Sequence, residues 1–342
     1  MAIRRTTMQD VADAAGVSQA TVSLVLNDVV GSGIAEATKV RVRAEAERLG
    51  YRNNRLARNL KLQTSDSIGF VSEHITTSPL AVGMVQGAQD AARAAGKYLL
   101  IENVDFDPDE PHVVSEQRAI DDLLERQVDG IVFASMYHRV VEVPAVLHET
   151  NSILLDARAL DASISSVVPD EYVAAAQATS YLLDAGHRSI VHLTGPLGPP
   201  ASNLRRSGFM DAFAQLDLDV EPASIIECEA NTPSAFEAAL EVLQRADRPT
   251  SMFCFNDEMA WGVYQAAFDL GLAIPEDLSV VGFDDMSLIA PVLRPGLTTM
   301  RLPHYEMGRW AVEHLLSGDN SVIEHAMECQ LIERGSVAAP SS

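Results

Sequence analysis

Residues Thr7–Asp28 read TMQDVADAAGVSQATVSLVLND, which is the pattern of two short helices joined by a tight turn. A first helix is expected from Met8 to Ala15 and a second from Gln19 to about Leu26. Gly16 lies between them and supplies the left-handed backbone that ends the first helix. Two short helices joined by such a turn form a helix-turn-helix.

Polar residues mark both helix starts. Thr7 with Asp10 three positions later resembles a capping box, and Ser18 can cap the second helix. If the apolar positions are buried between the helices, the second helix presents an outward set, namely Gln19, Ala20, Ser23, Leu24 and Asn27. The second helix of this motif enters the DNA major groove, so the set indicates a DNA-reading face. Any pair of short amphipathic helices with a glycine turn shares this pattern, which leaves a purely structural helix pair as the alternative.

The charge distribution supports the DNA interpretation. The chain has 342 residues and a net charge of −23, which by itself argues against a nucleic-acid partner. Residues 1–62, however, hold ten basic and six acidic side chains, a balance of +4, so the remainder carries −27. A basic head on an acidic body indicates that only the head contacts DNA.

The head is completed by a third helix at about residues 35–49, ended by Gly50. The segment YRNNRLARNLKL at residues 51–62 follows, and it is too short and too polar to be a stable helix in isolation. Arg55 and Arg58 can meet phosphates, and Leu60 can act as a wedge in the minor groove if the segment folds on DNA. A plain linker is the alternative.

From Ser67 onward, apolar strands alternate with helices in two successive series, which predicts two doubly wound parallel sheets in two lobes. The expected strands are SIGFVS, YLLIENV, DGIVFAS and SILLDA, then SIVHLTG, ASIIECE, SMFCFN and SVVGFD. Expected domains are 1–50, a hinge at 51–64, and a body at 65–342. The expected lobes are about 65–166 with 299–325, and about 167–298 with 326–342.

Several of these strands end in polar residues. Ligands of open parallel sheets bind beyond the carboxyl ends of the strands, so these residues predict a polar cleft. For Asp257 and Asp285 a helix cap is an equal alternative. Arg205, expected at a helix start, can add a forked donor. The strand-end residues are Ser72, Glu73, His74, Ser135, Asp156, Asn256, Asp257, Asp284 and Asp285.

Other functional classes have little support in the sequence. Catalytic and phosphate-loop motifs are missing, and the nine histidines lack metal-ligand spacing, so we expect neither an enzyme nor a metal or other cofactor. The cysteines, Cys228, Cys254 and Cys329, are far apart in the sequence and are interpreted as packing residues. The chain has neither a signal-peptide pattern nor a long apolar run, and this predicts a cytoplasmic, nucleoid-associated protein with no membrane partner.

The chain resembles the LacI/GalR family of bacterial transcription regulators over nearly its whole length. The blocks that carry the resemblance include DVADAAGVSQATVSLVLN, RLGYRNNRLARNL, GHRSIVHLTG, RRSGFMDAF and FCFNDEMAWGVYQAAFDLGLAIPEDLSVVGFDD. The resemblance implies a helix-turn-helix head, a hinge helix that orders on DNA, and a periplasmic-binding-protein-like body. It also implies a homodimer on a palindromic operator, with a small effector that is most often a sugar.

By position, the resemblance assigns base reading to Gln19, Ala20 and Leu24, and phosphate contacts to Ser18, Thr21, Ser23 and Asn27. Thr7 and the hinge residues Asn54, Arg55, Ala57, Arg58 and Leu60 complete the DNA set. Glu73, Asp156, Arg205, Asn256 and Asp284 match effector positions. The sequence departs from the family pattern at three places. Leu24 stands where many members have arginine, and Asn53 replaces the proline that is often found just before the hinge. Around Ala230 and Asn231, the aromatic residue that often stacks on the effector ring is missing.

These observations predict an effector-controlled regulator, most simply a repressor. Two alternatives stay open at this point. One is a cytoplasmic sugar-binding protein or sugar-acting enzyme with a vestigial head, and the other is an activator.

Overall fold

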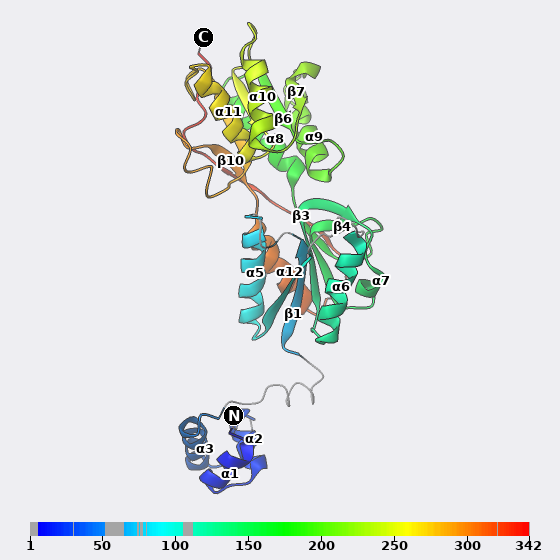
Figure 1. Cartoon of the computed structure of the whole chain (residues 1–342), viewed down its shortest axis with the longest axis vertical. Coiled ribbons are helices and arrows are strands. Elements are labelled where there is room, and N and C mark those ends of the chain that lie inside the picture. The colour runs from blue at the N-terminus through cyan, green and yellow to red at the C-terminus, as the bar shows by residue number, and fades with distance from the viewer. Residues whose placement is uncertain are drawn as a thin grey trace. The chain divides into compact units, whose positions relative to one another are not determined.

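The computed structural model describes residues 6–29, 31–51, 65–73, 75, 78–79, 81–104, 112–319 and 321–341. The chain forms two compact units, Met1–Ser65 and Asp66–Ser342, both drawn in Figure 1. No described helix is long and apolar enough to cross a membrane.

The first unit is a three-helix bundle. Its helices are α1 (Met8–Ala15), α2 (Gln19–Leu26) and α3 (Glu36–Arg48), so the first two helices have the predicted bounds. The capping box is present, because the Thr7 backbone N donates to Asp10 Oδ2 over 2.8 Å and the Asp10 N donates to Thr7 Oγ1 over 3.3 Å. Gly16 ends α1 with a φ of 63°. This left-handed conformation has little steric cost for glycine, because glycine has no side chain.

The core of this unit is small but draws on all three helices. It consists of Val11, Ala12, Ala15, Val22, Val25, Val42 and Ala46. Arg41 on α3 donates from Nε to the Ala15 carbonyl over 2.9 Å, which satisfies an acceptor at the end of α1. The packing therefore fixes α2 against its neighbours and leaves the other side of α2 exposed.

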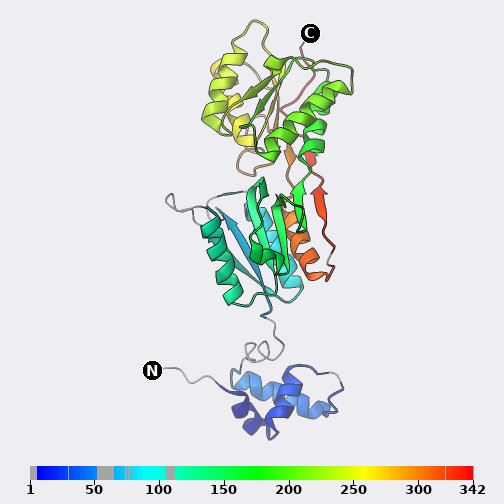
Figure 2. The same cartoon turned by 90° about the vertical axis from the view of Figure 1, so that its right-hand side faces the viewer.

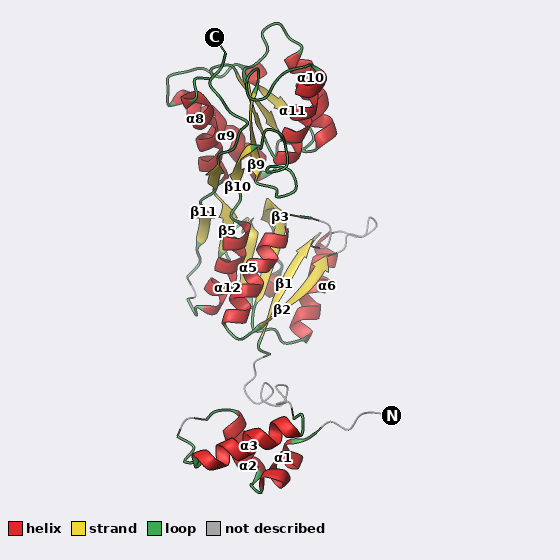
Figure 3. Ribbon diagram, turned by 90° about the vertical axis from the view of Figure 1, so that its left-hand side faces the viewer, coloured by secondary structure: helices red, strands yellow, loops and turns green. Residues whose placement is uncertain are grey.

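The N-lobe of the second unit contains a fully parallel six-stranded sheet in the order β11-β5-β4-β3-β1-β2. Its strands are β1 (Ser67–Glu73), β2 (Tyr98–Val104), β3 (Ile131–Val141), β4 (Ser152–Ala159), β5 (Ser166–Pro169) and β11 (Glu324–Met327). Helices cover both faces, as Figures 1 and 3 show. They are α5 (Ala81–Ala94) and α12 (His304–Leu316) on one face, and α6 (His112–Glu125) and α7 (Ala145–His148) on the other.

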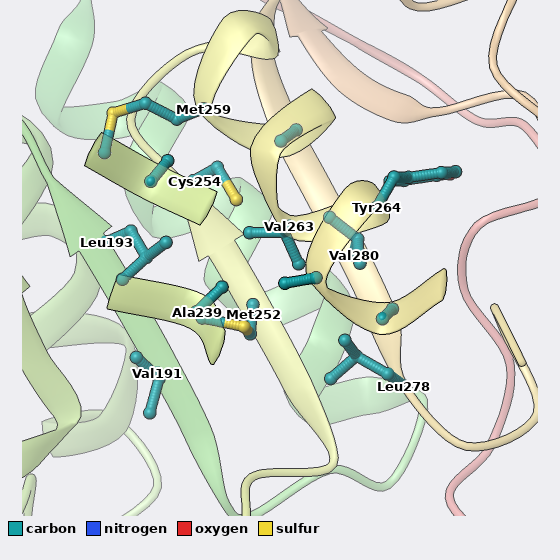
Figure 4. Close-up of a cluster of buried hydrophobic side chains, with 14 of the residues drawn as sticks. Val191, Leu193, Ala239, Met252, Cys254, Met259, Val263, Tyr264, Leu278 and Val280 are labelled. Atoms are coloured by element: carbon teal, nitrogen blue, oxygen red, sulfur yellow. The ribbon is translucent and has the colours of Figure 1, made fainter. Parts of the chain in front are cut away.

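The C-lobe repeats this topology in the order β12-β10-β9-β8-β6-β7, with the edge strand β12 antiparallel to β10. Its strands are β6 (Ile190–Thr194), β7 (Ile225–Glu227), β8 (Ser251–Cys254), β9 (Ser279–Asp284), β10 (Thr298–Arg301) and β12 (Gln330–Ile332). Its helices are α8 (Glu171–Asp184), α9 (Pro200–Ala214), α10 (Thr232–Leu243) and α11 (Asp257–Asp269), with a 3-10 turn at Pro222–Ser224. Figure 4 shows part of its core, where Met252 and Val280 of the sheet meet Val263 of α11.

The chain passes between the lobes three times, visible between the two sheets in Figure 2. The crossovers follow β5, β10 and β11, at residues 170, 302–303 and 328–329. The boundaries expected from the sequence, at about 166/167, 298/299 and 325/326, lie three to four residues before these crossovers, inside β5, β10 and β11. Uniformly apolar runs identify a buried strand but not the sheet to which it belongs.

Helices α5 and α12 pack side by side at very close range. An ideal Cβ on Gly87 of α5 would lie 1.9 Å from the Tyr305 carbonyl oxygen, and one on Gly308 of α12 would lie 2.0 Å from the Met84 carbonyl oxygen. The two backbones therefore touch where side chains normally separate helices, and both glycines are required there.

We predict that Gly87→Ala destabilises the body. In an isolated helix the change would be favourable by about 1 kcal/mol, but here the added methyl group forces α5 from α12 at a net cost of about 2 kcal/mol. Urea unfolding followed by circular dichroism measures the effect. The control is Ala94→Gly in the exposed last turn of α5, which should lose no more than about 1 kcal/mol. A stability gain for Gly87→Ala would contradict the close packing.

Candidate functional site

The exposed face of α2 is the first candidate site. Gln19, Ala20 and Leu24 are exposed, and Thr21 and Ser23 are half-buried beside them. Ser18 caps the helix by accepting from the Thr21 backbone N over 3.1 Å, and its hydroxyl lies 2.9 Å from Thr21 Oγ1. The helix therefore offers a mixed polar and apolar face on a rigid support.

Three residues predicted to contact DNA also hold the helix ends. Thr7 is part of the capping box of α1, Ser18 caps α2, and Asn27 Nδ2 donates to the Ser23 carbonyl over 2.8 Å at the other end of α2. The predicted hinge residues Asn54, Arg55, Ala57, Arg58 and Leu60 lie outside the described residues, as does the predicted effector residue His74.

A buried cavity of about 180 Å³ lies between the two lobes of the second unit. The N-lobe contributes residues 136–138 and Asp156, and the C-lobe contributes Arg205, Asn256 and Asp284. Four of the predicted effector residues, Asp156, Arg205, Asn256 and Asp284, therefore line one cavity. It adjoins a more open cleft of about 530 Å³, with which it shares Tyr137, Asn256 and Asp284.

A large bulge in β3 shapes the N-lobe wall of this cavity. Ala134 pairs with Leu155 of β4, but the next pair is Arg139 with Ala157, so residues 135–138 all lie opposite Asp156. Such an insertion bends the strand and redirects its side chains. It brings Tyr137 and His138 to the cavity, and no pattern in the sequence indicated it.

Three other predicted effector residues lie beside this bulge and outside the cavity lining. Glu73 Oε1 accepts from Ser135 Oγ over 3.2 Å and from the Met136 backbone N over 3.4 Å, and Glu73 Oε2 lies 3.4 Å from an Arg139 nitrogen. Ser72 Oγ donates to the Glu73 carbonyl over 3.3 Å. None of the three residues lines the cavity in this structure, and Glu73 and Ser135 contact each other at the bulge.

Two cavity carboxyls lie on strained backbone. Asp156 has a φ of 55° and Asp284 a φ of 107°, in the left-handed region that residues with a side chain rarely adopt. Strain of this kind gathers at functional sites. Burial, with a further contribution from Glu171, raises the pKa of Asp156 well above its usual value, and burial also raises the pKa of Asp284.

Two buried polar atoms at the cavity have no hydrogen-bond partner within the described part of the chain. They are Asp156 Oδ1 and His138 Nδ1, on side chains from residues that are each 3 % exposed. Burial, with contributions from Arg158 and Arg205, lowers the pKa of His138 to about 4, so this imidazole is neutral near pH 7. Buried atoms of this type require a partner, which a bound ligand can supply.

Arg205 occupies the C-lobe wall and is almost fully engaged. Its Nε donates to Glu171 Oε2 over 2.6 Å and its Nη2 donates to Glu171 Oε1 over 3.2 Å, while Nη1 donates to the Phe255 carbonyl. Its guanidinium lies 3.6 Å from the centre of the Phe283 ring and 4.3 Å from that of Phe255. Arg205 lies in the second turn of α9, which begins at Pro200 and not at the arginine as expected.

Asp257 and Asn256 have structural roles in the C-lobe. Asp257 is fully buried away from the cavity, accepting from Thr299 Oγ1 over 2.7 Å and from the Met286 backbone N over 2.6 Å. Asp257 does not line the cavity, and burial raises its pKa to about 7. Asn256 lines the cavity and also caps α11, accepting from the Met259 N over 2.8 Å.

Sequence reasoning missed several cavity residues, chiefly Glu171, His138 and His304. Glu171 lies two residues after β5, so the strand-end rule could have found it had residues 166–169 been predicted as a strand. His304 begins α12 at a crossover. The described residues include no group of acidic, histidine or cysteine side chains suited to a metal, and the three cysteines are free thiols.

The chain is similar to known regulators along its length. Residues 7–54 match the lacI family of bacterial regulatory proteins, and residues 179–337 match the periplasmic binding protein-like domain. The HTH-type transcriptional regulator AscG of Escherichia coli (strain K12) is 33 % identical over 348 residues, covering 98 % of this chain and 99 % of AscG.

Two solved structures are similar over nearly the whole chain. The lac repressor dimer bound to operator and the anti-inducer ONPF has a TM-score of 0.82 at 26 % identity, covering 98 % of this chain and 100 % of that one. The complex of the transcriptional regulator CelR with cellobiose has a TM-score of 0.67 at 25 % identity, covering 97 % of this chain and 100 % of that one.

We predict that Glu171→Ala strongly destabilises the body, because it leaves the Arg205 guanidinium buried without its counter-charge. Breaking a buried pair in this way costs about 3–5 kcal/mol. The matched control is Glu241→Ala, which removes an exposed helical pair with Arg245 at a cost below about 1 kcal/mol. Chemical unfolding of both variants measures the difference, and equal losses would contradict the role given to the buried pair.

Proposed function

Because the chain belongs to the LacI family of bacterial regulatory proteins, we propose that it is a transcriptional repressor whose binding to a palindromic operator is controlled by a small effector in the inter-lobe cavity. The observation that carries this proposal is the exposed face of α2, formed by Gln19, Ala20 and Leu24 on a capped and packed helix. We place this repressor in the cytoplasm, without a cofactor.

The DNA interface is formed by α2 in the major groove. Gln19 and Ala20, at the N-terminal end of the helix, contact base edges, and Leu24 adds an apolar contact suited to a thymine methyl group. Ser18, Thr21, Ser23 and Asn27 surround this face and supply phosphate contacts. The positive balance of residues 1–62 attracts the duplex, while the acidic body limits unspecific binding.

The effector is a small hydroxyl-bearing molecule, most simply a saccharide. The cavity offers carboxyl oxygens on Asp156 and Asp284 and an amide on Asn256, which suit hydroxyl groups. Phe255 offers an apolar surface for the face of a ring. The cellobiose of the CelR complex supports this ligand class.

Effector binding affects the DNA-binding head by changing the angle between the two lobes. The cavity touches two of the three crossovers, since it is lined by Glu171 just after β5 and by Leu302 and His304 just after β10. A ligand that contacts both lobes favours one lobe arrangement, and this shifts the population of operator-competent dimers. By linkage, operator binding changes effector affinity by the same factor.

The dimer forms through the body, with α11 as part of the interface. Trp261, Gln265 and Phe268 lie four and three residues apart on one exposed face of this helix. Trp261 is 44 % exposed and Phe268 is 82 % exposed, and both border an apolar groove with Phe236 and Leu293. Large exposed apolar patches mark interaction surfaces, and the dimer of the lac repressor structure supports a second copy as the partner.

We predict that Gln19→Ala weakens binding to the operator by about 1–3 kcal/mol and leaves binding to unrelated duplex nearly unchanged, because it removes a base contact. Fluorescence anisotropy with the DNA upstream of the protein's own gene, over a salt series and with a sugar panel, measures this. The control is Gln9→Ala, an exposed glutamine on α1 bonded to Asp13, which should affect both duplexes alike. Equal losses for Gln19→Ala would remove it from the base-reading set.

We also predict that Phe268→Glu converts the dimer to a monomer without unfolding it, because the new charge lies on an exposed surface. Operator affinity should then fall by at least about 100-fold, since two linked heads gain affinity through effective concentration. Analytical ultracentrifugation and anisotropy measure the two effects. The control is Val173→Glu on α8, half-exposed on the opposite face of the C-lobe sheet, which should stay dimeric. A Phe268→Glu protein that is still a dimer would exclude this face.

A further inference from the structure

The inter-lobe cavity has more acidic than basic lining groups. The acidic groups are Asp156, Glu171 and Asp284, and the one arginine is Arg205, whose Nη2 donates to Glu171 and lies 3.9 Å from Asp284 Oδ1. The two lining histidines, His138 and His304, have pKa values lowered to about 4, chiefly by burial, and add no positive charge near pH 7. The acidic groups therefore outnumber the cation by two, and burial raises the pKa of Asp156 and Asp284 well above the usual value, which favours their protonated forms while the described lining holds no further cation.

The open cleft that adjoins the cavity is also lined by acidic side chains. The adjoining cleft is lined by Glu229, Glu258 and Asp284, and its described lining includes no lysine, arginine or histidine. Of the arginines outside these two linings, Arg301 lines a second adjoining pocket and donates to the neutral Gln330, whereas two others contact carboxylates. Arg139 contacts Glu73 and Glu116, and Arg158 lies 4.0 Å from Glu324. A cleft lined by one sign of charge attracts ligands of the opposite sign.

Arg205 has few hydrogen-bond donors and little net positive charge left to bind an anionic ligand. The Glu171 carboxylate takes two of its nitrogens and neutralises its charge, the Phe255 carbonyl takes the third, and Phe283 and Phe255 lie against the guanidinium. An anion could bind here only by breaking a buried ion pair whose groups are 4 % and 2 % exposed. Phosphorylated and carboxylated ligands are therefore disfavoured.

Asp156 is the buried carboxyl with an unfilled acceptor. Its Oδ1 lacks a hydrogen-bond partner in the described part of the chain, its side chain lines the cavity, and no basic side chain forms an ion pair with it there. The partner that best satisfies such an atom both donates a hydrogen bond and carries positive charge.

We propose that the effector is a hydroxylated molecule with a protonated amine, as in an amino sugar, and that Asp156 binds the amine. This inference rests on the proposed function, because it specifies the ligand of the same cavity. A neutral sugar would leave the Asp156 carboxyl buried without a counter-charge, whereas an ammonium group supplies both a hydrogen bond to Asp156 Oδ1 and the charge that stabilises the ionised carboxylate. The raised pKa of Asp156 fits the same account, since a buried carboxyl without a cation favours its protonated form.

The test compares amino sugars with their neutral partners on the full-length protein. The probes are glucosamine with glucose, galactosamine with galactose and mannosamine with mannose, at about pH 6.5, where a simple amine is protonated. Thermal shift and calorimetry should find at least one amino sugar that binds about tenfold or more tightly than its neutral partner. A neutral partner that binds equally well, or no thermal shift with any amino sugar at about 10 mM, overturns the proposal.

Single substitutions test which residue causes the preference for an amine over a hydroxyl group. Asp156→Asn keeps the shape of the side chain and should reduce the amine-to-hydroxyl affinity ratio about tenfold. Glu229→Gln, at the exposed rim, should weaken amine binding about twofold and leave the neutral sugar unchanged. Asp247→Asn, the same charge change on an exposed loop outside the cavity, is the control and should change neither ligand. An unchanged ratio in Asp156→Asn contradicts the role of this residue.

Operator binding, measured in parallel without ligand and with each sugar, distinguishes a failure of the amine proposal from a failure of the proposed repressor function. Operator binding that responds to a neutral sugar alone overturns the amine and leaves the repressor function standing. Amine binding by a protein that recognises no operator overturns the function and leaves the ligand class standing.

Discussion

The buried pair of Arg205 and Glu171 is the interaction on which the body's arrangement depends. Glu171 begins α8 immediately after the first crossover, and Arg205 lies on α9, which packs against α8. Burial, followed by the positive charge of Arg205, lowers the pKa of His304 at the second crossover. Burial and Glu171 raise the pKa of Cys329 at the third crossover, and Arg205 opposes that rise. One guanidinium thus lies near all three passages between the lobes. Because a buried charge is tolerated only with its partner in place, this pair constrains the cavity and the crossovers together.

The cavity itself is built from departures from regular structure. On the N-lobe side, four residues of β3 bulge opposite Asp156, held by the Glu73 carboxylate. Asp156 within β4 and Asp284 at the end of β9 both have a positive φ. Strain at Asp156 and Asp284 is maintained by the close-packed sheets beneath them, whose buried strands leave little room to relax. The large cores of the lobes therefore support a small, strained and acidic site.

The two units differ in size and charge, and these differences suit them to different functions. The head is a bundle with a seven-residue core, and one such bundle offers a DNA-binding surface of limited area. The body has extensive cores, a ligand cavity and an exposed apolar face on α11. In the proposed function, dimerisation through the body gives two weak heads a high effective concentration, so that a ligand acts on DNA binding by changing the lobes alone.

Local patterns in the sequence determined the helix-turn-helix, the caps at Thr7 and Ser18, and the alternation of strands and helices in two lobes, because these depend on neighbours a few residues apart. The strand-end rule also identified Asp156, Asn256 and Asp284 as cavity residues, since parallel strands place their carboxyl ends at one edge. Tertiary structure alone decided that Glu73 and Ser135 support a bulge, that Asp257 is held by Thr299, and that Glu171 neutralises Arg205. Those partners are 34–62 residues apart in the sequence, and their pairing is fixed by sheet order and helix packing, which no local pattern encodes.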